Sequence, residues 1–87
     1  MGRYRVFIKT SAAKEIEAVD QKKDRQRIVA KIQSLTENPR PPGCEKLSGH
    51  EDKYRVREGP YRIVYSIEDK KLEVRVVKVG HRKEVYR

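Results

Sequence analysis

The sequence predicts an α+β domain with the element order β-α-α-β-β-β. Two observations support this prediction. Apolar and polar residues alternate in one run near the N-terminus and in three runs after residue 53, and apolar residues recur at helical spacing in two segments between them. We expect the two N-terminal helices to pack on one face of a small, mainly antiparallel twisted sheet, with a short C-terminal tail. A chain of 87 residues is enough for a single domain, expected over residues 1–87.

The first strand and the first helix are predicted within the first 19 residues. The strand alternates Tyr4, Val6 and Ile8 with Arg5, Phe7 and Lys9. Thr10 and Ser11 offer hydroxyl groups for the N-cap of a helix over residues 11–19. The apolar stripe of that helix consists of Ala12, Ile16 and Val19.

A second helix is predicted over residues 25–35, after a polar turn at residues 20–24. Its apolar stripe consists of Ile28, Ile32 and Leu35. Asn38-Pro39 ends the helical region, because a residue before proline is pushed out of the α conformation. The segment 38–52, rich in proline and glycine, predicts a surface loop with Leu47 as its main apolar anchor.

Three strands follow the loop: Tyr54–Glu58, Tyr61–Glu68 and Leu72–Val79. Gly59-Pro60 joins the first two, and residues 69–71 form the second turn. The alternation of the last strand slips at Val77, which predicts a β-bulge or a local twist.

The hairpin brings three arginines to one side of the sheet. With Gly59-Pro60 as a two-residue loop, Arg57 pairs with Arg62, and directly opposed residues point to the same side. Arg55 lies two residues from Arg57 and shares that side. The other side has the apolar residues that the helices are expected to bury: Tyr54, Val56, Tyr61, Ile63, Tyr65 and Ile67.

These arginines form a candidate anion site. No carboxylate is expected opposite them, and the guanidinium group suits phosphate oxygens through its fixed pair of donors. A solvated polar face, on which the arginines splay apart in water, is the alternative interpretation.

The C-terminal tail, residues 81–87, extends the candidate site if it folds back over the same face as a short tail or helical turn. It contains His81, Arg82 and Tyr86. The positive charges of an arginine cluster favour the neutral form of a neighbouring histidine, and a neutral imidazole can accept a proton near neutral pH. Tyr86 could stack on a base, handle a proton or simply anchor the tail by packing.

The net charge is +9 and the pI is about 9.9, which favours a polyanionic partner, although basicity without a specific partner is also common. Residues 1–52 have 11 Lys/Arg and 8 Asp/Glu, net +3, whereas residues 53–87 have 11 and 5, net +6. Lys53, Lys78 and Lys83 in this basic segment are the candidate residues for binding such a polyanion.

Other chemistries fit the sequence less well. No set of His, Cys, Asp and Glu has metal-ligand spacing, no glycine loop suits phosphate binding, and no paired carboxylates suggest a glycosidase, so we expect no metal and no cofactor. Cys44 lies in a loop, where a single cysteine is usually incidental. One cysteine, no signal-peptide run and no membrane-spanning stretch lead us to expect a cytoplasmic protein.

Three separated motifs resemble the RelE branch of the RelE/ParE toxin superfamily: NPRPPGCEKLSG, YRVREGPYRIVYSIED and VVKVGHRKEVYR. The resemblance covers essentially the whole chain. It implies a toxin of a type II toxin–antitoxin pair that cuts mRNA in the ribosomal A site without a metal, using the RNA 2′-hydroxyl as nucleophile. It also implies a RelB-like antitoxin as partner, and contact with 16S rRNA.

The resemblance assigns catalytic roles to the arginines of the hairpin, Arg55, Arg57 and Arg62, and to Arg82 and Tyr86 of the tail. Familiar RelE members have lysines where this chain has Arg55 and Arg57. Arginine cannot serve as a general base, since it does not lose its proton in proteins. Proton transfer is therefore expected from His81 or Tyr86. The alternatives are a ParE-like DNA gyrase poison, which is not a nuclease, and a non-catalytic RNA-binding module.

Overall fold

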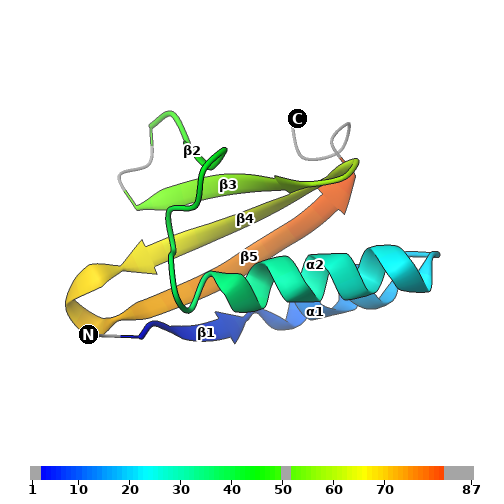
Figure 1. The fold of residues 1–87 in the computed structure, drawn as a ribbon, viewed down its shortest axis with the longest axis horizontal. Coiled ribbons are helices and arrows are strands. Elements are labelled where there is room, and N and C mark those ends of the chain that lie inside the picture. The colour runs from blue at the N-terminus through cyan, green and yellow to red at the C-terminus, as the bar shows by residue number, and fades with distance from the viewer. Residues whose placement is uncertain (1–2, 50–51, 82–87) are drawn as a thin grey trace.

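The computed structural model describes residues 3–49 and 52–81. Five strands form one sheet in the order β1-β5-β4-β3-β2, and two helices pack against it (Figure 1). The strands are β1 Arg5–Ile8, β2 Glu45–Lys46, β3 Lys53–Glu58, β4 Tyr61–Glu68 and β5 Glu73–His81. The helices are α1 Thr10–Glu17 and α2 Lys22–Ser34, and a short 3-10 helix, η1, spans Asp69–Lys71. The predicted α+β class is confirmed, with β2 as an additional strand.

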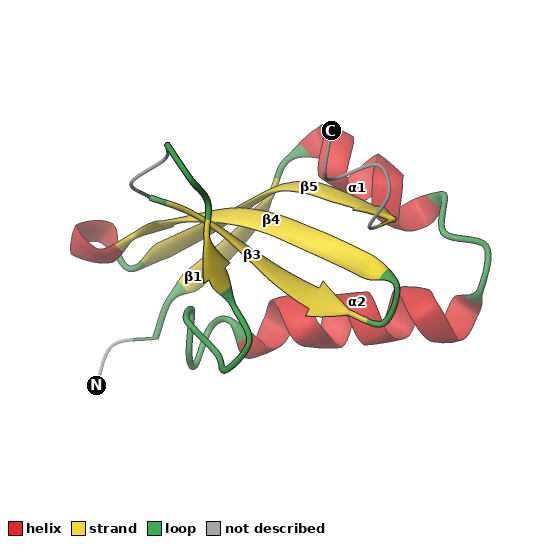
Figure 2. Cartoon of the chain, turned by 90° about the horizontal axis from the view of Figure 1, so that it is seen from above, coloured by secondary structure: helices red, strands yellow, loops and turns green. Residues whose placement is uncertain are grey.

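The sheet is mainly antiparallel, as predicted. Strand β1 pairs with β5 in parallel, and the remaining three pairs of neighbouring strands are antiparallel. Strand β2 forms inside the segment predicted as a loop, and it pairs Glu45 with Arg55 and Lys46 with Tyr54. Two residues are too few for a recognisable alternation, so this strand depends on its neighbour β3. Figure 2 shows the twist of the sheet and helix α2 running alongside it.

The predicted N-cap of α1 is wrong. Lys9 occupies the N-cap position, and no side chain caps the helix, so Thr10 and Ser11 are its first residues. The Lys9 amide donates to the carbonyl of Val76 (2.9 Å), which ties this residue to β5. Only Lys9 separates strand β1 from the helix, and its side chain has no oxygen atom that could cap the helix.

Helix α2 begins three residues earlier than predicted, so the turn before it is shorter. Lys22 is its first residue, and the predicted turn at residues 20–24 loses its last three residues to the helix. Nothing in this stretch breaks a helix, and Asp24 in the first turn interacts favourably with the positive end of the helix dipole.

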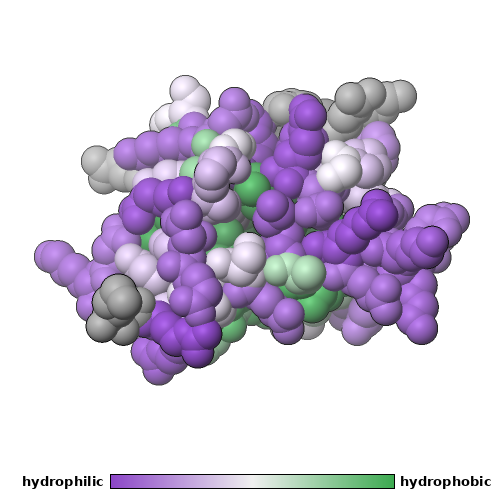
Figure 3. Space-filling model, viewed as in Figure 1, coloured by the Kyte–Doolittle hydropathy of each residue, from purple (hydrophilic) through white to green (hydrophobic). Residues whose placement is uncertain are grey.

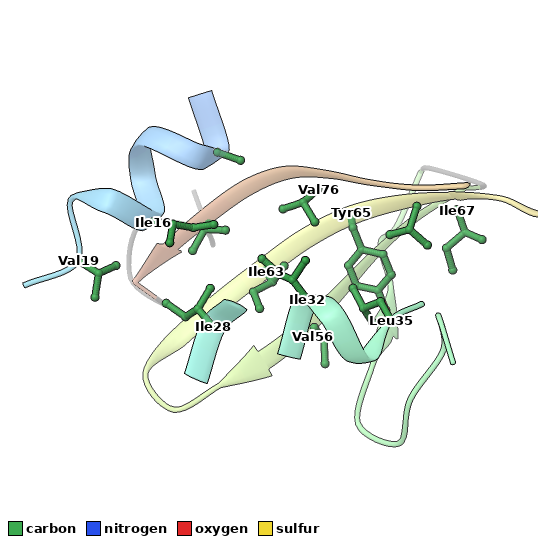
Figure 4. Packing of buried hydrophobic residues seen from close by; sticks show 13 residues of the cluster. Ile16, Val19, Ile28, Ile32, Leu35, Val56, Ile63, Tyr65, Ile67 and Val76 are labelled. Atoms are coloured by element: carbon green, nitrogen blue, oxygen red, sulfur yellow. The ribbon is translucent and has the colours of Figure 1, made fainter. Parts of the chain in front are cut away.

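The hydrophobic core lies between the helices and one face of the sheet (Figure 4). The predicted helix stripes and the apolar side of the hairpin meet there. The buried cluster consists of Ala12, Ile16, Val19, Ile28, Ile32, Leu35, Val56, Ile63, Tyr65, Ile67, Val74, Val76 and Val79. Each fully buried aliphatic side chain contributes roughly 1.5–3 kcal/mol to folding. Helical and strand periodicity thus bury matching apolar faces, as predicted.

The predicted irregularity at Val77 is a β-bulge. Val64 pairs with Lys78 whereas Tyr65 pairs with Val76, which leaves Val77 as the extra residue on β5. The bulge restores the alternation on both sides of it, so that Val76 and Val79 both face the core. Strand β5 also continues to His81, which the sequence had placed in the tail.

The surface is mostly hydrophilic in the view of Figure 3, with hydrophobic residues visible only in small areas. Within the described residues, neither helix has the length and apolar character needed to cross a membrane.

Candidate functional site

The hairpin has the predicted register. Arg57 lies opposite Arg62, and Glu58 lies opposite Tyr61. Gly59 has a φ of 58°, a left-handed conformation that suits glycine in the turn. Arg55 lies opposite Val64, so the structure brings all three arginines of the hairpin to the face of the sheet that points away from the core.

The three arginines differ in depth. Arg62 is only 4% exposed, which is unusual for a charged residue. The Arg55 side chain is 19% exposed, and Arg57 is exposed. The cluster therefore runs from a buried guanidinium group to one at the surface, unlike the freely splayed arginines of a solvated face.

A pocket of about 390 Å³ opens beside these arginines. Its lining comes from α2, the proline-rich segment and the hairpin: Lys31, Pro42, Gly43, Glu45, Arg55, Val56, Arg57 and Arg62. Strand β2 pairs with β3 only as far as Arg55, so the rest of the β3 edge is left uncovered by β2. The pocket forms beside this uncovered part of the edge.

Glu45 corrects the expectation that no carboxylate faces the arginines. Strand β2 places it opposite Arg55, whose Nη2 donates to Glu45 Oε1 at 2.6 Å. This hydrogen bond and the charge of Arg55 lower the pKa of Glu45, and the charges of Arg62 and Arg57 lower it further. Sequence reasoning missed Glu45 because only the short strand β2 brings it to the site.

His81 does not share the arginine face, so its predicted position is wrong. It lies opposite Tyr61, whose side chain packs against the core. The two rings lie edge to face, with their centroids 5.9 Å apart. Both residues line a second pocket of about 320 Å³, together with Glu15 and Val19. The alternation of β5 turns His81 toward the helices, because one residue separates it from the buried Val79.

The predicted lysines have different environments. Lys53 lies two residues from Arg55 on the arginine face and is half-buried. Lys78 Nζ donates to Glu15 Oε2 at 3.0 Å, so this carboxylate offsets its charge. The other oxygen of Glu15 accepts the amide of Val79 at 2.9 Å. The remaining predicted residues, Arg82, Lys83 and Tyr86, lie outside the described residues.

A polar cluster, which we call the Arg40 clasp, holds the proline-rich segment against the sheet. Arg40 donates to both carboxylate oxygens of Asp69, at 3.1 and 2.8 Å, and the Tyr4 hydroxyl donates to Asp69 Oδ1 at 2.6 Å. Arg40 Nε also donates to the Tyr54 hydroxyl at 3.2 Å. Hydrogen bonds from Arg40 and Tyr4 lower the pKa of Asp69 to about 2.

The Arg40 clasp matters for the site because Arg40 lies two residues before Pro42, which lines the arginine pocket. A second anchor is the Tyr65 hydroxyl, which donates to the Pro39 carbonyl at 2.7 Å in a buried position. The predicted anchor Leu47 is only half-buried. Contacts between residues far apart in sequence therefore hold this wall of the pocket, and no local motif signals them.

The pocket is suited to a phosphodiester. Guanidinium groups at different depths can donate to several phosphate oxygens, and partial burial strengthens each of these interactions. Such groups stabilise the extra negative charge that develops on the phosphoryl oxygens during transesterification. A phosphate that enters must compete with Glu45 for Arg55.

Comparison with known proteins identifies similar chains among toxins. The profile of a family described as "ParE toxin of type II toxin-antitoxin system, parDE" matches residues 6–86. A putative RelE-like toxin protein of Escherichia coli is 35% identical over 82 residues, which is 92% of this chain and 84% of that protein.

Solved structures of RelE proteins have the same fold. The archaeal RelE–RelB complex from Pyrococcus horikoshii matches with a TM-score of 0.82 and 29% identity, over 92% of this chain and 96% of that chain. The intact E. coli RelBE toxin–antitoxin complex matches with a TM-score of 0.76 and 31% identity, over 90% of this chain and 95% of that chain.

Proposed function

Since this chain belongs to the RelE/ParE superfamily of toxins from type II toxin–antitoxin systems, we propose that it is an endoribonuclease that cuts mRNA in the ribosomal A site and so inhibits translation. The observation that supports this proposal is the pocket that gathers Arg55, Arg57 and Arg62. A phosphodiester is the ligand that this combination of charge and geometry suits best.

The proposed reaction is a transesterification that requires no metal. The 2′-hydroxyl of one nucleotide attacks the adjacent phosphorus, the bond to the 5′ oxygen breaks, and the products have a 2′,3′-cyclic phosphate and a 5′-hydroxyl. Arg62 and Arg57 donate to the phosphoryl oxygens as negative charge develops on them, and Arg55 assists. In a known oxyanion hole, removal of one such donor costs about 10²–10³-fold in rate.

Proton transfer is assigned to groups other than the arginines. Glu45 lines the pocket and can accept the proton of the 2′-hydroxyl once the phosphate has taken its place on Arg55, because loss of that hydrogen bond makes the carboxylate more basic. Tyr86 is the proposed proton donor to the 5′ oxygen. His81 would have to turn away from Tyr61 to take this role.

The proposed partners are a RelB-like antitoxin, mRNA and 16S rRNA. Both solved relatives described above are complexes with RelB antitoxins, which supports an antitoxin partner for this chain. The net charge of +9 favours association with the polyanionic ribosome. A DNA gyrase poison is the second candidate, because the matching family is described as ParE toxins.

The test is single-turnover cleavage of mRNA on programmed ribosomes by wild type, Arg62→Ala, Arg62→Gln and the control Arg27→Ala. Arg27 is an exposed residue of α2 outside the arginine pocket. We expect both Arg62 variants to lose about 100-fold or more in rate while they remain folded by circular dichroism, and the control to keep its activity.

If a folded Arg62 variant cleaved mRNA at the wild-type rate, the assignment of the site would be refuted. Inhibition of DNA gyrase supercoiling by the wild type, without cleavage of ribosome-bound mRNA, would favour the second candidate instead.

A further inference from the structure

The face of the sheet that bears the arginines also has an exposed aromatic residue, 39% exposed, at its far edge. Phe7 of β1 lies beside Arg75 of β5, Arg75 lies opposite Ser66 of β4, and Ser66 lies opposite Lys53 of β3. Paired residues point to the same side of a sheet, so these four side chains form one line across four strands. We call this line the Phe7 row.

Two guanidinium groups flank the Phe7 ring. The central carbon of Arg75 lies 4.9 Å from the ring centroid, and that of Arg5 lies 5.9 Å from it. Both arginines also donate to Glu73, which is 14% exposed: Arg5 to Oε2 at 3.0 Å and Arg75 to Oε1 at 3.4 Å. Glu73 thus holds the two cations beside the ring, although it offsets part of their charge.

The packing of the core does not explain Phe7. The neighbouring residues of β5, Val74 and Val76, are fully buried on the helix side, whereas Phe7 points to the opposite side. A partly exposed aromatic ring between cations, on the face of a sheet, is the arrangement with which several RNA-binding modules stack an unpaired base. Arginine side chains stack on bases as well.

The Phe7 row lies within reach of an RNA bound in the arginine pocket. Phe7 is two strands away from β4, and Ser66 is four residues away from Arg62 along β4. With the usual spacings between strands and between residues, the separation is roughly 16 Å. A single strand of RNA spans this distance in a few nucleotides. Lys53 lies on the same face, at the opposite end of the row from Phe7 and two residues from Arg55.

We propose that the Phe7 row, together with Arg5, is a subsite for single-stranded RNA, in which an unpaired base stacks on Phe7 and Arg75, Arg5 contacts a flanking phosphate, and Lys53 contacts a phosphate further along the strand. This inference rests on the proposed function, because it assumes that the arginine pocket holds the scissile phosphodiester of the same strand. The subsite adds affinity a few nucleotides from the cleaved bond and is tolerant of base identity, since every base has a π face.

The test is fluorescence anisotropy with a labelled, fully 2′-O-methylated RNA of about ten nucleotides, a length within the range that single-strand binding sites cover. Phe7→Leu keeps an apolar side chain but removes the π system, and Phe7→Trp retains it. The control is Val29→Ala, because Val29 is 38% exposed but lies on helix α2.

We expect Phe7→Leu to weaken RNA binding roughly 5- to 100-fold, Phe7→Trp to bind at least as well as wild type, and the control to be unchanged. The antitoxin affinity of each variant is measured in parallel. Equal RNA binding by Phe7→Leu and wild type would overturn the subsite, and so would weaker antitoxin binding with unchanged RNA binding.

A comparison of RNA binding by Arg62→Ala and Phe7→Leu also separates this inference from the proposed function. If Arg62→Ala weakens RNA binding and Phe7→Leu does not, the subsite fails and the arginine pocket stands. If Phe7→Leu weakens binding and Arg62→Ala does not, RNA contacts the Phe7 row but the pocket assignment fails. Absence of RNA binding by wild type would overturn the subsite, whereas the proposed function is decided separately by cleavage on programmed ribosomes.

Discussion

The Arg40 clasp can be tested by Asp69→Asn, which removes the negative charge at its centre. Asp69 accepts hydrogen bonds from Arg40 and Tyr4, and these bonds connect the proline-rich segment, the residue before strand β1 and the turn before β5. The asparagine side chain has nearly the same shape, so the variant tests the charge and not the packing. We expect it to fold but to be less stable than wild type.

The expected loss follows from how exposed the partners are. The side chains of Arg40 and Asp69 are 43% and 53% exposed, so their ion pair is worth about 0.2–1 kcal/mol. The hydrogen bond from Tyr4 is also exposed, and the asparagine oxygen can still accept it, so the ion pair sets the expected loss. A loss near 1 kcal/mol corresponds to a fall in Tm of roughly 4–8 °C for a domain of this size.

The loss should depend on pH in a defined direction. The pKa of Asp69 is lowered from 3.8 to about 2 in the folded protein. A lowered pKa means that the carboxylate stabilises the fold above about pH 4 and that this contribution disappears as the pH falls toward 2. The difference in unfolding free energy between wild type and Asp69→Asn should therefore shrink over this interval.

Urea titrations of both proteins over a pH series measure this difference directly, with Glu68→Gln as the control at the neighbouring exposed position. The comparison cancels the titration of all other carboxylates. Equal stability of wild type and Asp69→Asn at neutral pH, or a difference that stays constant down to pH 2, would refute the role given to the clasp.

Two further predictions concern the wall of the pocket and its carboxylate. Tyr65→Phe should lower the unfolding free energy by about 1–3 kcal/mol, measured by urea titration, because the buried Pro39 carbonyl loses its donor; a change within error would show that another donor replaces the hydroxyl. Glu45→Gln should slow single-turnover cleavage by about 10²–10⁴-fold and remove the acidic limb of the pH–rate profile, because a glutamine cannot accept the proton. An unchanged pH profile would limit Glu45 to its ion pair with Arg55.

Several features of the fold could be predicted because they depend on residues close together in the sequence. The two-residue turn at Gly59-Pro60 sets the register of the hairpin, so the pairing of Arg57 with Arg62 follows from the position of the turn. The slip at Val77 predicted the bulge for the same reason. The family resemblance, read from three motifs, agrees with the family profile and the RelE structures.

The errors have a common cause. Glu45 and the Arg40 clasp depend on contacts between segments far apart in the chain, which leave no periodic pattern in the sequence. His81 was assigned to a tail that folds back, but β5 continues through it and alternation turns it toward Tyr61. Helix starts also differed by a few residues, as is usual when capping side chains do not decide them.

By itself, the sequence determined which residues share a face, because the periods of helices and strands are properties of the backbone. It therefore placed Arg55, Arg57 and Arg62 together and the apolar residues opposite them. Only the tertiary structure decided the depth of each arginine, the carboxylate that faces them and the exposed Phe7 across the same sheet. Burial and long-range pairing depend on which segments are neighbours in space, and the strand order β1-β5-β4-β3-β2 determines those neighbours.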